Sequence, residues 1–314
     1  MQEWMHTAVE ATAADAPHMN PVPPVVPGRT LHVDGDIIAY WAGGNDETPV
    51  GISRMTALNK IAQMQEYSGA ERVVVHLTAE SSTKGDRYII ATVKPYQGHR
   101  KSGRKPKNWE YLRRWMESYE GPAFRVKIWA TREADDGMAL MAYHADGNDV
   151  TATKDKDMRM LPGWHLDWDT LAMVHVPVDT YDLVHDGKQY GIKWFWLQML
   201  QGDTADNIPG LPMYQGKPVG PKTAEAMLHL AETRADAQAW VEVAYHDLYG
   251  GGWADALVEQ ALLLWLRTDN GANIYNVLTV LGNSPAIRRA LDKVNKRIEE
   301  VYAEAQRITS QVPS

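Results

Sequence analysis

Carboxylate side chains gather in four short clusters along this chain of 314 residues. The clusters are Asp34 with Asp36, Glu133 with Asp135 and Asp136, Asp155 with Asp157, and Asp203 with Asp206. Like charges brought together repel one another unless cations neutralise them. Mg²⁺ and Mn²⁺ prefer oxygen ligands, and two such ions about 4 Å apart suit the hydrolysis of a phosphodiester. If the clusters meet in space, the chemistry they predict is two-metal phosphodiester hydrolysis.

Each cluster taken alone has a plainer explanation. Asp34 and Asp36 flank Gly35 as turn residues do, and acids at 133–136 would stabilise the N-terminus of a helix. In "ATKDKDMRMLPG" the acids alternate with Lys154 and Lys156, which is typical of a solvated turn, and we expect that role for the two lysines. The joint pattern favours a site, because three of the four clusters follow predicted parallel strands.

The elements that would position these acids are strands alternating with helices. Short β-branched runs lie at 31–33, 72–77, 124–130 and 149–153. Between the first two, the segment 53–68 has a helical pattern whose expected buried face is Met55, Leu58, Ala62 and Tyr67. This alternation predicts an α/β fold with a central, mainly parallel sheet flanked by helices. Ligand sites in such sheets lie beyond the carboxyl ends of the strands, which is where the acids fall.

The rest of the chain divides by composition and periodicity. We expect a disordered, Pro-rich tail at 1–28, an α/β domain at 29–190, a helical lobe at 191–282 and a C-terminal amphipathic helix at 283–314. Asp186-Gly187 is expected at the turn of a hairpin, followed by a helix near 192–201 and one opened by Pro221. The last helix carries an apolar stripe that we expect to pack against the body: Ile287, Leu291, Val294, Ile298, Val301 and Ala305.

Charge is unevenly distributed. The net charge of −8 argues, by itself, against a nucleic-acid partner. The segment 84–107 is basic although the whole chain is acidic. It contains a single acid, Asp86, and these basic residues: Lys84, Arg87, Lys94, Arg100, Lys101, Arg104, Lys105 and Lys107. Such separation is expected where acids gather at a metal site and bases gather along a polyanion.

The absence of cysteine excludes disulfides and thiolate zinc sites. The sequence has no apolar run long enough for a bilayer and no signal peptide, so we expect a cytoplasmic protein with no membrane partner.

A longer motif carries a resemblance. The segment "QGDTADNIPGLP", followed by "GPKTAEAML", resembles the helix-three-turn-helix with which metal-dependent 5′ nucleases grip the DNA backbone. This family comprises flap endonucleases, the 5′ nuclease domain of bacterial DNA polymerase I and phage 5′–3′ exonucleases, and the chain is most similar to the last group over roughly residues 30–232. The resemblance implies a PIN-like 5′ nuclease fold with a basic arch at about 80–118, and a phage-infected bacterial host as the setting.

The resemblance also assigns residues. It implies the metal ligands Asp34, Glu133, Asp135, Asp136, Asp155, Asp157, Asp203 and Asp206, with Asp36 as a candidate of second rank. In the arch, Gln97 stands where the family usually has a phosphate-orienting lysine, while Arg100 keeps the second basic position. The candidates to supply the missing charge are Lys101, Lys94 and Lys84. The expected DNA-binding residues are Arg87, Tyr96, Arg104, Lys105, Gly210, Gly220, Lys222 and Thr223.

Two departures from the family pattern bear on the site. The usual Asp after the second strand is missing, and Glu80 or Asp86 is the nearest replacement. The loop "GLPMYQGKPVGPKT" is also longer than usual. Of the aromatic residues near the arch, Tyr96 and Tyr111 could stack on unpaired bases, whereas core packing is the expectation for Trp109. Lone histidines, His32, His76 and His99, are expected to be structural or exposed.

The resulting expectation is a structure-dependent 5′ nuclease of replication or repair that uses two Mg²⁺ or Mn²⁺ ions. Its partner would be DNA with 5′ ends, flaps or duplex-single-strand junctions, and its state a monomer. A monovalent cation at the helix-three-turn-helix is a further expectation from the resemblance. Two alternatives remain open at this point. One is a catalytically impaired DNA-binding accessory protein, favoured by Gln97 and the missing Asp, and the other is a PIN-type metal-dependent ribonuclease.

Overall fold

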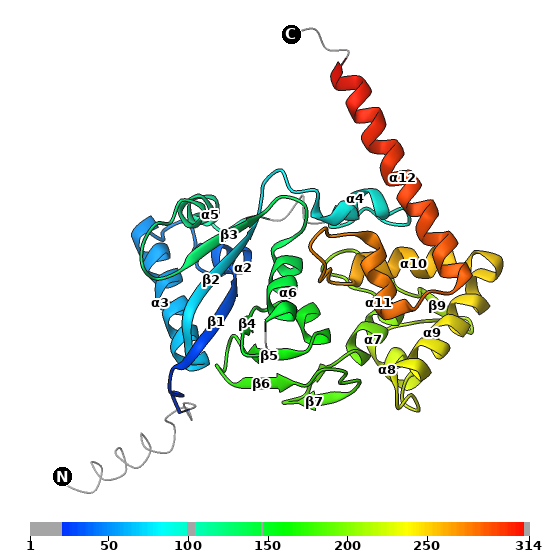
Figure 1. Ribbon diagram of the computed structural model, residues 1–314, viewed down its shortest axis with the longest axis horizontal. Coiled ribbons are helices and arrows are strands. Elements are labelled where there is room, and N and C mark those ends of the chain that lie inside the picture. The colour runs from blue at the N-terminus through cyan, green and yellow to red at the C-terminus, as the bar shows by residue number, and fades with distance from the viewer. Residues whose placement is uncertain (1–20, 99–103, 146, 311–314) are drawn as a thin grey trace, which may run out of the picture.

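A six-stranded sheet forms the centre of the α/β part of the molecule (Figure 1). The computed structural model describes residues 21–98, 104–145 and 147–310. The strand order is β3-β2-β1-β4-β5-β6. The bounds are β1 Val26–Asp34, β2 Ala70–Thr78, β3 Arg125–Trp129, β4 Val150–Ala152, β5 Gly163–Leu166 and β6 Met173–Val176. All neighbouring strands pair in parallel except β6, which runs antiparallel to β5. The predicted fold class is thereby confirmed.

Helices cover both faces of this sheet. Helices α2 Gly35–Trp41, α3 Val50–Ser68 and α5 Trp109–Glu117 share a core with β1 and β2, and α6 Ala134–His144 lies on the opposite side, toward the lobe (Figure 1). The predicted buried face of α3 is wrong in part, since Met55 is 57% exposed and Ala62 is exposed as well. The sheet instead receives Ala57, Ile61 and Met64, which lie at the alternating spacing of four and three of the neighbouring face.

The ends of the α/β part differ slightly from expectation. Strand β1 begins at Val26, so the predicted tail 1–28 overlaps it, and residues 1–20 lie outside the described chain. The predicted hairpin is confirmed as β7 Leu183–His185 paired with β8 Lys188–Tyr190. Its turn residues Asp186 and Gly187 have φ of 48° and 67°, as a two-residue turn of this kind requires.

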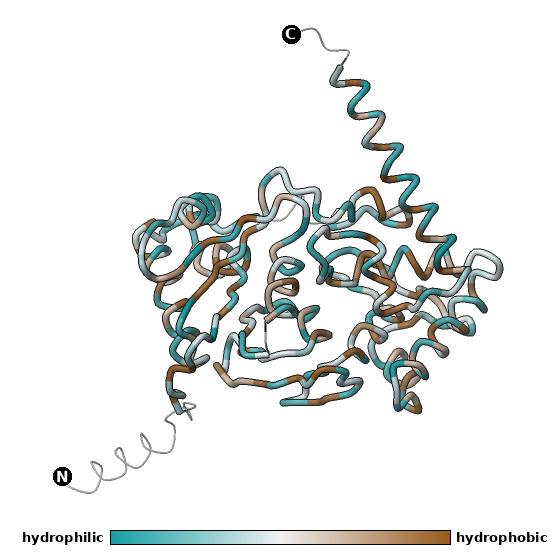
Figure 2. The backbone as a smooth tube through the Cα atoms, viewed as in Figure 1, coloured by the Kyte–Doolittle hydropathy of each residue, from teal (hydrophilic) through white to brown (hydrophobic). Residues whose placement is uncertain are grey.

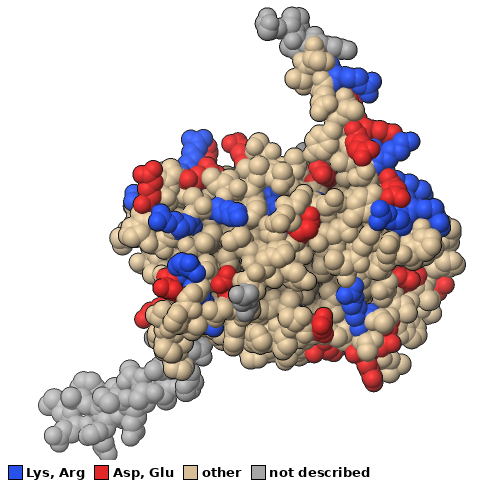
Figure 3. Space-filling view, viewed as in Figure 1, with Lys and Arg blue, Asp and Glu red and all other residues tan. Residues whose placement is uncertain are grey.

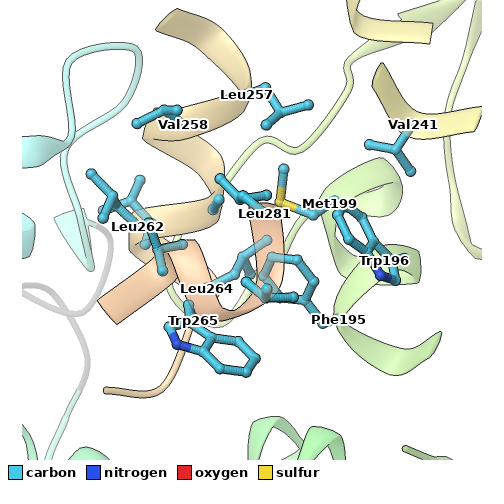
Figure 4. Close-up of a cluster of buried hydrophobic side chains, with 14 of the residues drawn as sticks. Phe195, Trp196, Met199, Val241, Leu257, Val258, Leu262, Leu264, Trp265 and Leu281 are labelled. Carbon is cyan, nitrogen blue, oxygen red and sulfur yellow. The ribbon is translucent and has the colours of Figure 1, made fainter. Parts of the chain in front are cut away.

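The helical lobe has its own apolar core (Figure 4). Its helices are α7 Lys193–Gln201, α8 Pro221–Met227, α9 Arg234–Tyr249, α10 Trp253–Leu264 and α11 Leu278–Leu281. Phe195, Trp196 and Leu262 are buried at its centre, and Met138 of α6 and Met158 belong to the same cluster. These shared side chains fix the lobe against the α/β part. The longer loop forms a small hairpin, β9 Met213–Tyr214 with β10 Lys217–Pro218.

Short elements connect these parts. The arch region begins with a 3-10 turn at Lys84–Asp86 and α4 Arg87–Ile90. Further 3-10 turns lie at Lys156–Met160, Gly250–Gly252 and Ile274–Val277. Residues 99–103 lie outside the described chain, so the expectations for His99, Arg100 and Lys101 cannot be placed.

The C-terminal helix α12, Pro285–Ser310, packs against the lobe over only part of its length. Ile287, Leu291, Val294 and Ile298 are buried as predicted. Val301 is 44% exposed and Ala305 is exposed, so the prediction that the whole stripe packs is wrong at its end. The helix projects past the body (Figure 1), alternates in hydropathy along its length (Figure 2) and carries interspersed charges of both signs (Figure 3).

Candidate metal centre

Asp34 lies at the carboxyl end of β1, where the chain turns into α2. Its carboxylate caps α2 by accepting a hydrogen bond from the Ile37 amide at 3.0 Å, and it accepts another from Thr153 Oγ1, just past β4, at 2.9 Å. Burial, together with the nearby charge of Asp36, raises the pKa of Asp34 to about 7. The ionised form of Asp34 is therefore disfavoured by burial beside a second acid.

The acids at the start of α6 and in the segment after β4 belong to the same region as Asp34. Glu133 caps α6, as predicted for acids in a helical first turn. Burial and the charges of Asp136 and Glu133 raise the pKa of Asp135 well above its usual range. Burial also raises the pKa of Asp155, with Asp203 and Glu133 acting in the same direction. The strand ends therefore bring these acids within electrostatic reach of one another, as their spacing after parallel strands predicts.

Asp157, Asp203 and Asp206 form the tightest group. Each offers one carboxylate oxygen within 4.8 Å of the others. Burial and the neighbouring Asp155 raise the pKa of Asp157 to about 8. Asp157 Oδ1 accepts a hydrogen bond from Gln198 Nε2 of α7 at 2.6 Å. Asp203 and Asp206 come from the lobe, so this group exists only because the lobe docks on the sheet.

Lys156 also belongs to this group, which differs from the expected solvated role. Its Nζ lies 2.5 Å from Asp203 Oδ2 and 3.4 Å from Asp157 Oδ1. Lys154 does behave as expected, because it is exposed and pairs with Asp169 at 2.9 Å. Lys154 precedes the 3-10 turn, whereas Lys156 is its first residue and lies beside Asp203 of the lobe.

The donor chemistry fits hard divalent cations. All the candidate ligands are carboxylate oxygens, which Mg²⁺ and Mn²⁺ prefer. The raised pKa values of Asp34, Asp155 and Asp157 arise from burial beside other acids, which bound cations would relieve. Asp157, Asp203 and Asp206 offer three oxygens close enough to share one ion.

Asp136 has a different role from the predicted one. It is fully buried and makes a two-point ion pair with Arg87, at 2.6 Å and 2.8 Å. The Arg267 amide donates to it as well, at 3.0 Å. Although burial alone would raise the pKa of Asp136, Arg87 holds it below its usual value. Both oxygens are thus committed to protein donors, and the structure does not present Asp136 as a metal ligand.

The same contacts overturn the DNA-binding expectation for Arg87. Its side chain is 2% exposed and donates to the carbonyl oxygens of Leu263 and Trp265 in the lobe, at 3.2 Å and 3.1 Å. A guanidinium buried in this way cannot reach a DNA phosphate. Arg87 instead joins the root of the arch, α6 and the lobe.

Neither candidate replaces the acid that is missing after β2. Glu80 is exposed, and Asp86 accepts a hydrogen bond from Tyr302 Oη of α12 at 2.6 Å. The acid that lies next to the end of β2 is Asp36. Its carboxylate accepts a hydrogen bond from the Thr78 amide at 3.2 Å and forms an ion pair with Arg113 of α5. Asp36 therefore lies beside the cluster, with part of its charge offset by an arginine.

The beginning of the arch is docked into the acid cluster. Tyr96 is 4% exposed, and its hydroxyl donates to Glu133 Oε2 at 2.6 Å and lies 3.0 Å from Asp206 Oδ2. A buried phenol cannot stack on an unpaired base, so that expectation for Tyr96 is wrong. Lys84 Nζ lies 3.3 Å from Glu133 Oε1 and 2.8 Å from Gln97 Oε1. Of the predicted basic candidates in the described chain, Lys84 is the one placed at the acids.

The remaining predicted DNA contacts are spread over two surfaces. Lys222 is exposed, and Gly220 and Thr223 are half-buried, at the start of α8. Gly210 is buried and its amide donates to Gln260 Oε1 at 3.0 Å, so its expected phosphate contact is wrong.

Near the arch, Lys94 is exposed, Arg104 pairs with Asp46, and Lys105 Nζ lies 3.7 Å from the ring centroid of Trp109. As predicted, Trp109 packs against the α/β core, and Tyr111 is 39% exposed.

The histidine expectation is confirmed for the two that are described. His32 and His76 are fully buried and hydrogen-bonded to each other at 3.0 Å. The chain of contacts continues to Asp149 at one end and to Trp129 Nε1 at the other, each at 3.0 Å. These rings are structural links between strands and do not face the acids.

Three side chains of the site escaped prediction: Lys156, Gln198 and Thr153. Lys156 follows Asp155 in a charge run that is usually solvated, and Gln198 is a polar residue flanked by the apolar residues Leu197 and Met199 of α7. An uncharged polar residue on the buried face of a helix is a usable signal, since it needs a partner. Thr153 directly follows a buried strand and signals in the same way.

Comparisons with known proteins concern the fold. No family model matches the chain, and no curated protein matches it. Among solved structures, the T5 D15 protein co-crystallised with metal ions matches with 17% identity and a TM-score of 0.53, over 87% of this chain and 99% of that chain. The bacteriophage T5 D15 flap endonuclease, as a variant in a pseudo-enzyme-product complex with DNA and metal ions, matches with 15% identity and a TM-score of 0.55, over 86% and 99%. The chain has the 5′ nuclease fold.

A third structure, T5 5′-exonuclease with zinc ions bound, matches with 16% identity and a TM-score of 0.52, over 85% of this chain and 99% of that chain. The 5′ nuclease fold here therefore includes both the sheet and the helical lobe, as the motif in 201–228 predicts. Of the helices in the described part of the chain, none is both long and apolar enough to cross a lipid bilayer.

Proposed function

We propose that this protein is a divalent-metal-dependent 5′ nuclease that hydrolyses DNA phosphodiesters. The observation that carries the proposal is the meeting of acids from three strand ends with two acids of the lobe, at one edge of the sheet. The 5′ nuclease fold supports the same conclusion, because the similar T5 proteins are described as a 5′-exonuclease and a flap endonuclease with metal ions.

The proposed metal ligands form two sets. Asp34, Asp135 and Asp155 would hold one ion, and Asp157, Asp203 and Asp206 would hold the other. Glu133, whose oxygens already contact Lys84, Gln97, Tyr96 and Arg87, would act on the first ion through water. Bound Mg²⁺ or Mn²⁺ would activate water and stabilise charge on the phosphate. Because two of the ligands belong to the lobe, a DNA strand must lie between the lobe and the sheet edge to be cut.

The cation that this chain brings to the reaction is Lys84. Burial alone would lower the pKa of Lys84. The neighbouring Glu133 carboxylate raises this pKa above its usual value, so the ammonium stays charged. A charged ammonium beside the acids can orient the scissile phosphate. Arg100 and Lys101, which follow the docked segment, are proposed to assist it.

The duplex is proposed to bind along the start of α8. There Gly220, Lys222 and Thr223 offer backbone amides and an ammonium, which contact phosphates without reading sequence. Binding is therefore expected to be independent of sequence and to weaken with salt. Lys94, Arg104 and Lys105 are proposed to extend this contact toward the arch.

The test compares wild type with Asp155→Asn on 5′-labelled duplex, flap and single-stranded DNA, with and without Mg²⁺. We expect wild type to release the label, a chelator to stop release, and the variant to bind DNA without cutting it. Cleavage that survives Asp155→Asn would contradict the assignment of the site.

One observation favours a second candidate, a DNA-binding accessory protein without catalysis. Neither Glu80 nor Asp86 replaces the acid that is missing after β2. If wild type binds these DNA substrates tightly and cuts none of them with either Mg²⁺ or Mn²⁺, the accessory role is supported and catalysis is refuted.

A further inference from the structure

Gln97 joins the two halves of the acid cluster. Its Nε2 donates to Glu133 Oε1 at 3.2 Å and to Asp206 Oδ1 at 3.1 Å. Its backbone amide also donates to the Asp206 carbonyl oxygen at 2.9 Å. Glu133 comes from the start of α6 and Asp206 from the lobe, so a single amide group spans the boundary between the α/β part and the lobe.

The side chain is held firmly in this position. Gln97 is 7% exposed, and its Oε1 accepts a hydrogen bond from Lys84 Nζ at 2.8 Å. The neighbouring Tyr96 hydroxyl contacts the other oxygens of the same two carboxylates, Glu133 Oε2 and Asp206 Oδ2. Both polar ends of the Gln97 amide are thus satisfied, and each carboxylate has one oxygen bonded by Gln97 and the other bonded by Tyr96.

A neutral amide suits this place better than an ammonium. Lys84 already supplies a positive charge 3.3 Å from Glu133. A lysine at position 97 would put a second ammonium beside the first, and like charges at such short range repel strongly. It would also offset more of the negative charge that attracts a divalent cation. An amide donates to both carboxylates without adding charge.

We propose that Gln97 is a positioning residue of the metal centre, orienting Glu133 and Asp206 across the boundary and so strengthening divalent-cation binding. Glu133 is also held from the α/β side, because its oxygens lie 3.3 Å from Lys84 Nζ and 3.3 Å from Arg87 Nη1, so Gln97 ties Asp206 of the lobe to a fixed carboxylate. Hydrogen bonds that orient metal ligands typically contribute about 10–100-fold in metal affinity. The inference rests on the proposed function, since it presupposes that these carboxylates bind divalent ions.

The test is Mn²⁺ binding to the full chain by isothermal titration calorimetry, without DNA. Gln97→Met keeps the length of the side chain and removes the donor, and we expect it to weaken one Mn²⁺ site by about 10–100-fold. Gln97→Lys is expected to weaken binding at least as much, because it pairs two ammoniums. The double variant Lys84→Gln/Gln97→Lys removes the second ammonium and is expected to bind Mn²⁺ more tightly than Gln97→Lys alone.

The matched control is Gln238→Met on α9. The Gln238 amide donates to Glu242 and to the Leu281 carbonyl oxygen, at 2.8 Å and 2.7 Å, and not to any acid of the cluster. Its Mn²⁺ affinity should equal that of wild type. A second readout is the Mg²⁺ concentration that gives half-maximal cleavage, which should rise for Gln97→Met while the rate at saturating Mg²⁺ recovers.

The outcomes separate the inference from the proposed function. Wild type that binds Mn²⁺, together with Gln97→Met that binds within twofold of it, would overturn the inference and leave the nuclease proposal intact. A double variant that binds no better than Gln97→Lys would also overturn it, and this comparison remains usable if Gln97→Met fails to fold. Wild type that binds no Mn²⁺ would refute both.

Discussion

Asp157→Asn should stabilise the metal-free protein while impairing its metal site. The Asp157 carboxyl has a pKa of about 8 in the fold, against 3.8 for an ordinary Asp, because it is buried and lies beside Asp155. With a raised folded-state pKa, its contribution to stability is fully present below pH 3.8 and is lost as the pH rises through about 8. Asn keeps the shape and the Gln198 contact, and it has no charge to bury.

The magnitude follows from the two pKa values. Each pH unit above 3.8 costs the metal-free protein about 1.4 kcal/mol until the folded-state pKa is reached, which gives about 4 kcal/mol at pH 7 as an upper limit. An unfolding entropy of about 2.1 cal/mol/K per residue gives about 0.66 kcal/mol/K for 314 residues. Asp157→Asn should therefore raise the Tm in chelator by up to about 6 °C.

The assay is thermal unfolding at pH 5, 7 and 8.5, in chelator and in excess Mn²⁺. In chelator, wild type should lose Tm as the pH rises, and the advantage of the variant should grow. In Mn²⁺ the order should reverse, because wild type binds the ion more tightly and binding stabilises the fold. Asp247→Asn, on the exposed surface of α9, makes the same charge change and should move the Tm by less than about 1 °C. A variant that is less stable than wild type in chelator at pH 8.5 would refute the reasoning.

The other predictions concern the buried ion pair, the lobe and proton release. Arg87→Met leaves the Asp136 carboxylate unpaired in the interior, so it should lower the free energy of unfolding by about 3–5 kcal/mol in a denaturant titration; adding Asp136→Asn should restore part of that loss. Gly210→Ala should destabilise strongly, because φ is 63° and a Cβ would lie 2.3 Å from the Gly202 amide nitrogen. Gly216→Ala, with φ of 76° and nothing within 4 Å, should cost only about 1 kcal/mol, and similar losses at both positions would contradict the packing argument. Divalent-ion binding near pH 7 should release protons, because Asp34 and Asp157 have pKa values of about 7 and about 8; calorimetry in two buffers of different ionisation enthalpy would detect this, and no buffer dependence would exclude it.

The tertiary structure changes how the basic segment is understood. Eight bases in 84–107 suggested one surface for a polyanion, yet Lys84 and Arg87 turn inward to acids of α6. Their neighbours Arg104 and Lys105 stay near the surface, beside Asp46 and Trp109. Part of the basic charge therefore compensates buried carboxylates, which a count along the chain cannot distinguish from charge that faces DNA.

The sequence by itself determined four of the six strands of the sheet and the position of the acids along them, whereas β5 and β6 were not predicted. Strand residues such as Val73 and Val75 have the β-branched run of a buried parallel strand, and Asp34 and Asp155 follow directly where such strands end. The hairpin turn could be predicted in the same way, because Asp186 and Gly187 are residue types that adopt the positive φ values of this turn. These features depend on residues that are neighbours in sequence, so periodicity and residue type suffice to find them.

Only the tertiary structure decided which acids face a common space and which are neutralised. Asp135 and Asp136 are adjacent and of the same type, yet their surroundings differ. The pKa of Asp135 is raised beside other acids, whereas Asp136 forms an ion pair with Arg87, 49 residues away. Gln97 likewise became a bridge because the lobe brings Asp206, 109 residues away, to its amide. Charge compensation and hydrogen bonding act through space at a few ångströms, so the role of a polar residue depends on its partners in the fold. The sequence alone placed the acids at the sheet edge, and the docking of the lobe brought Asp203 and Asp206 beside Asp157.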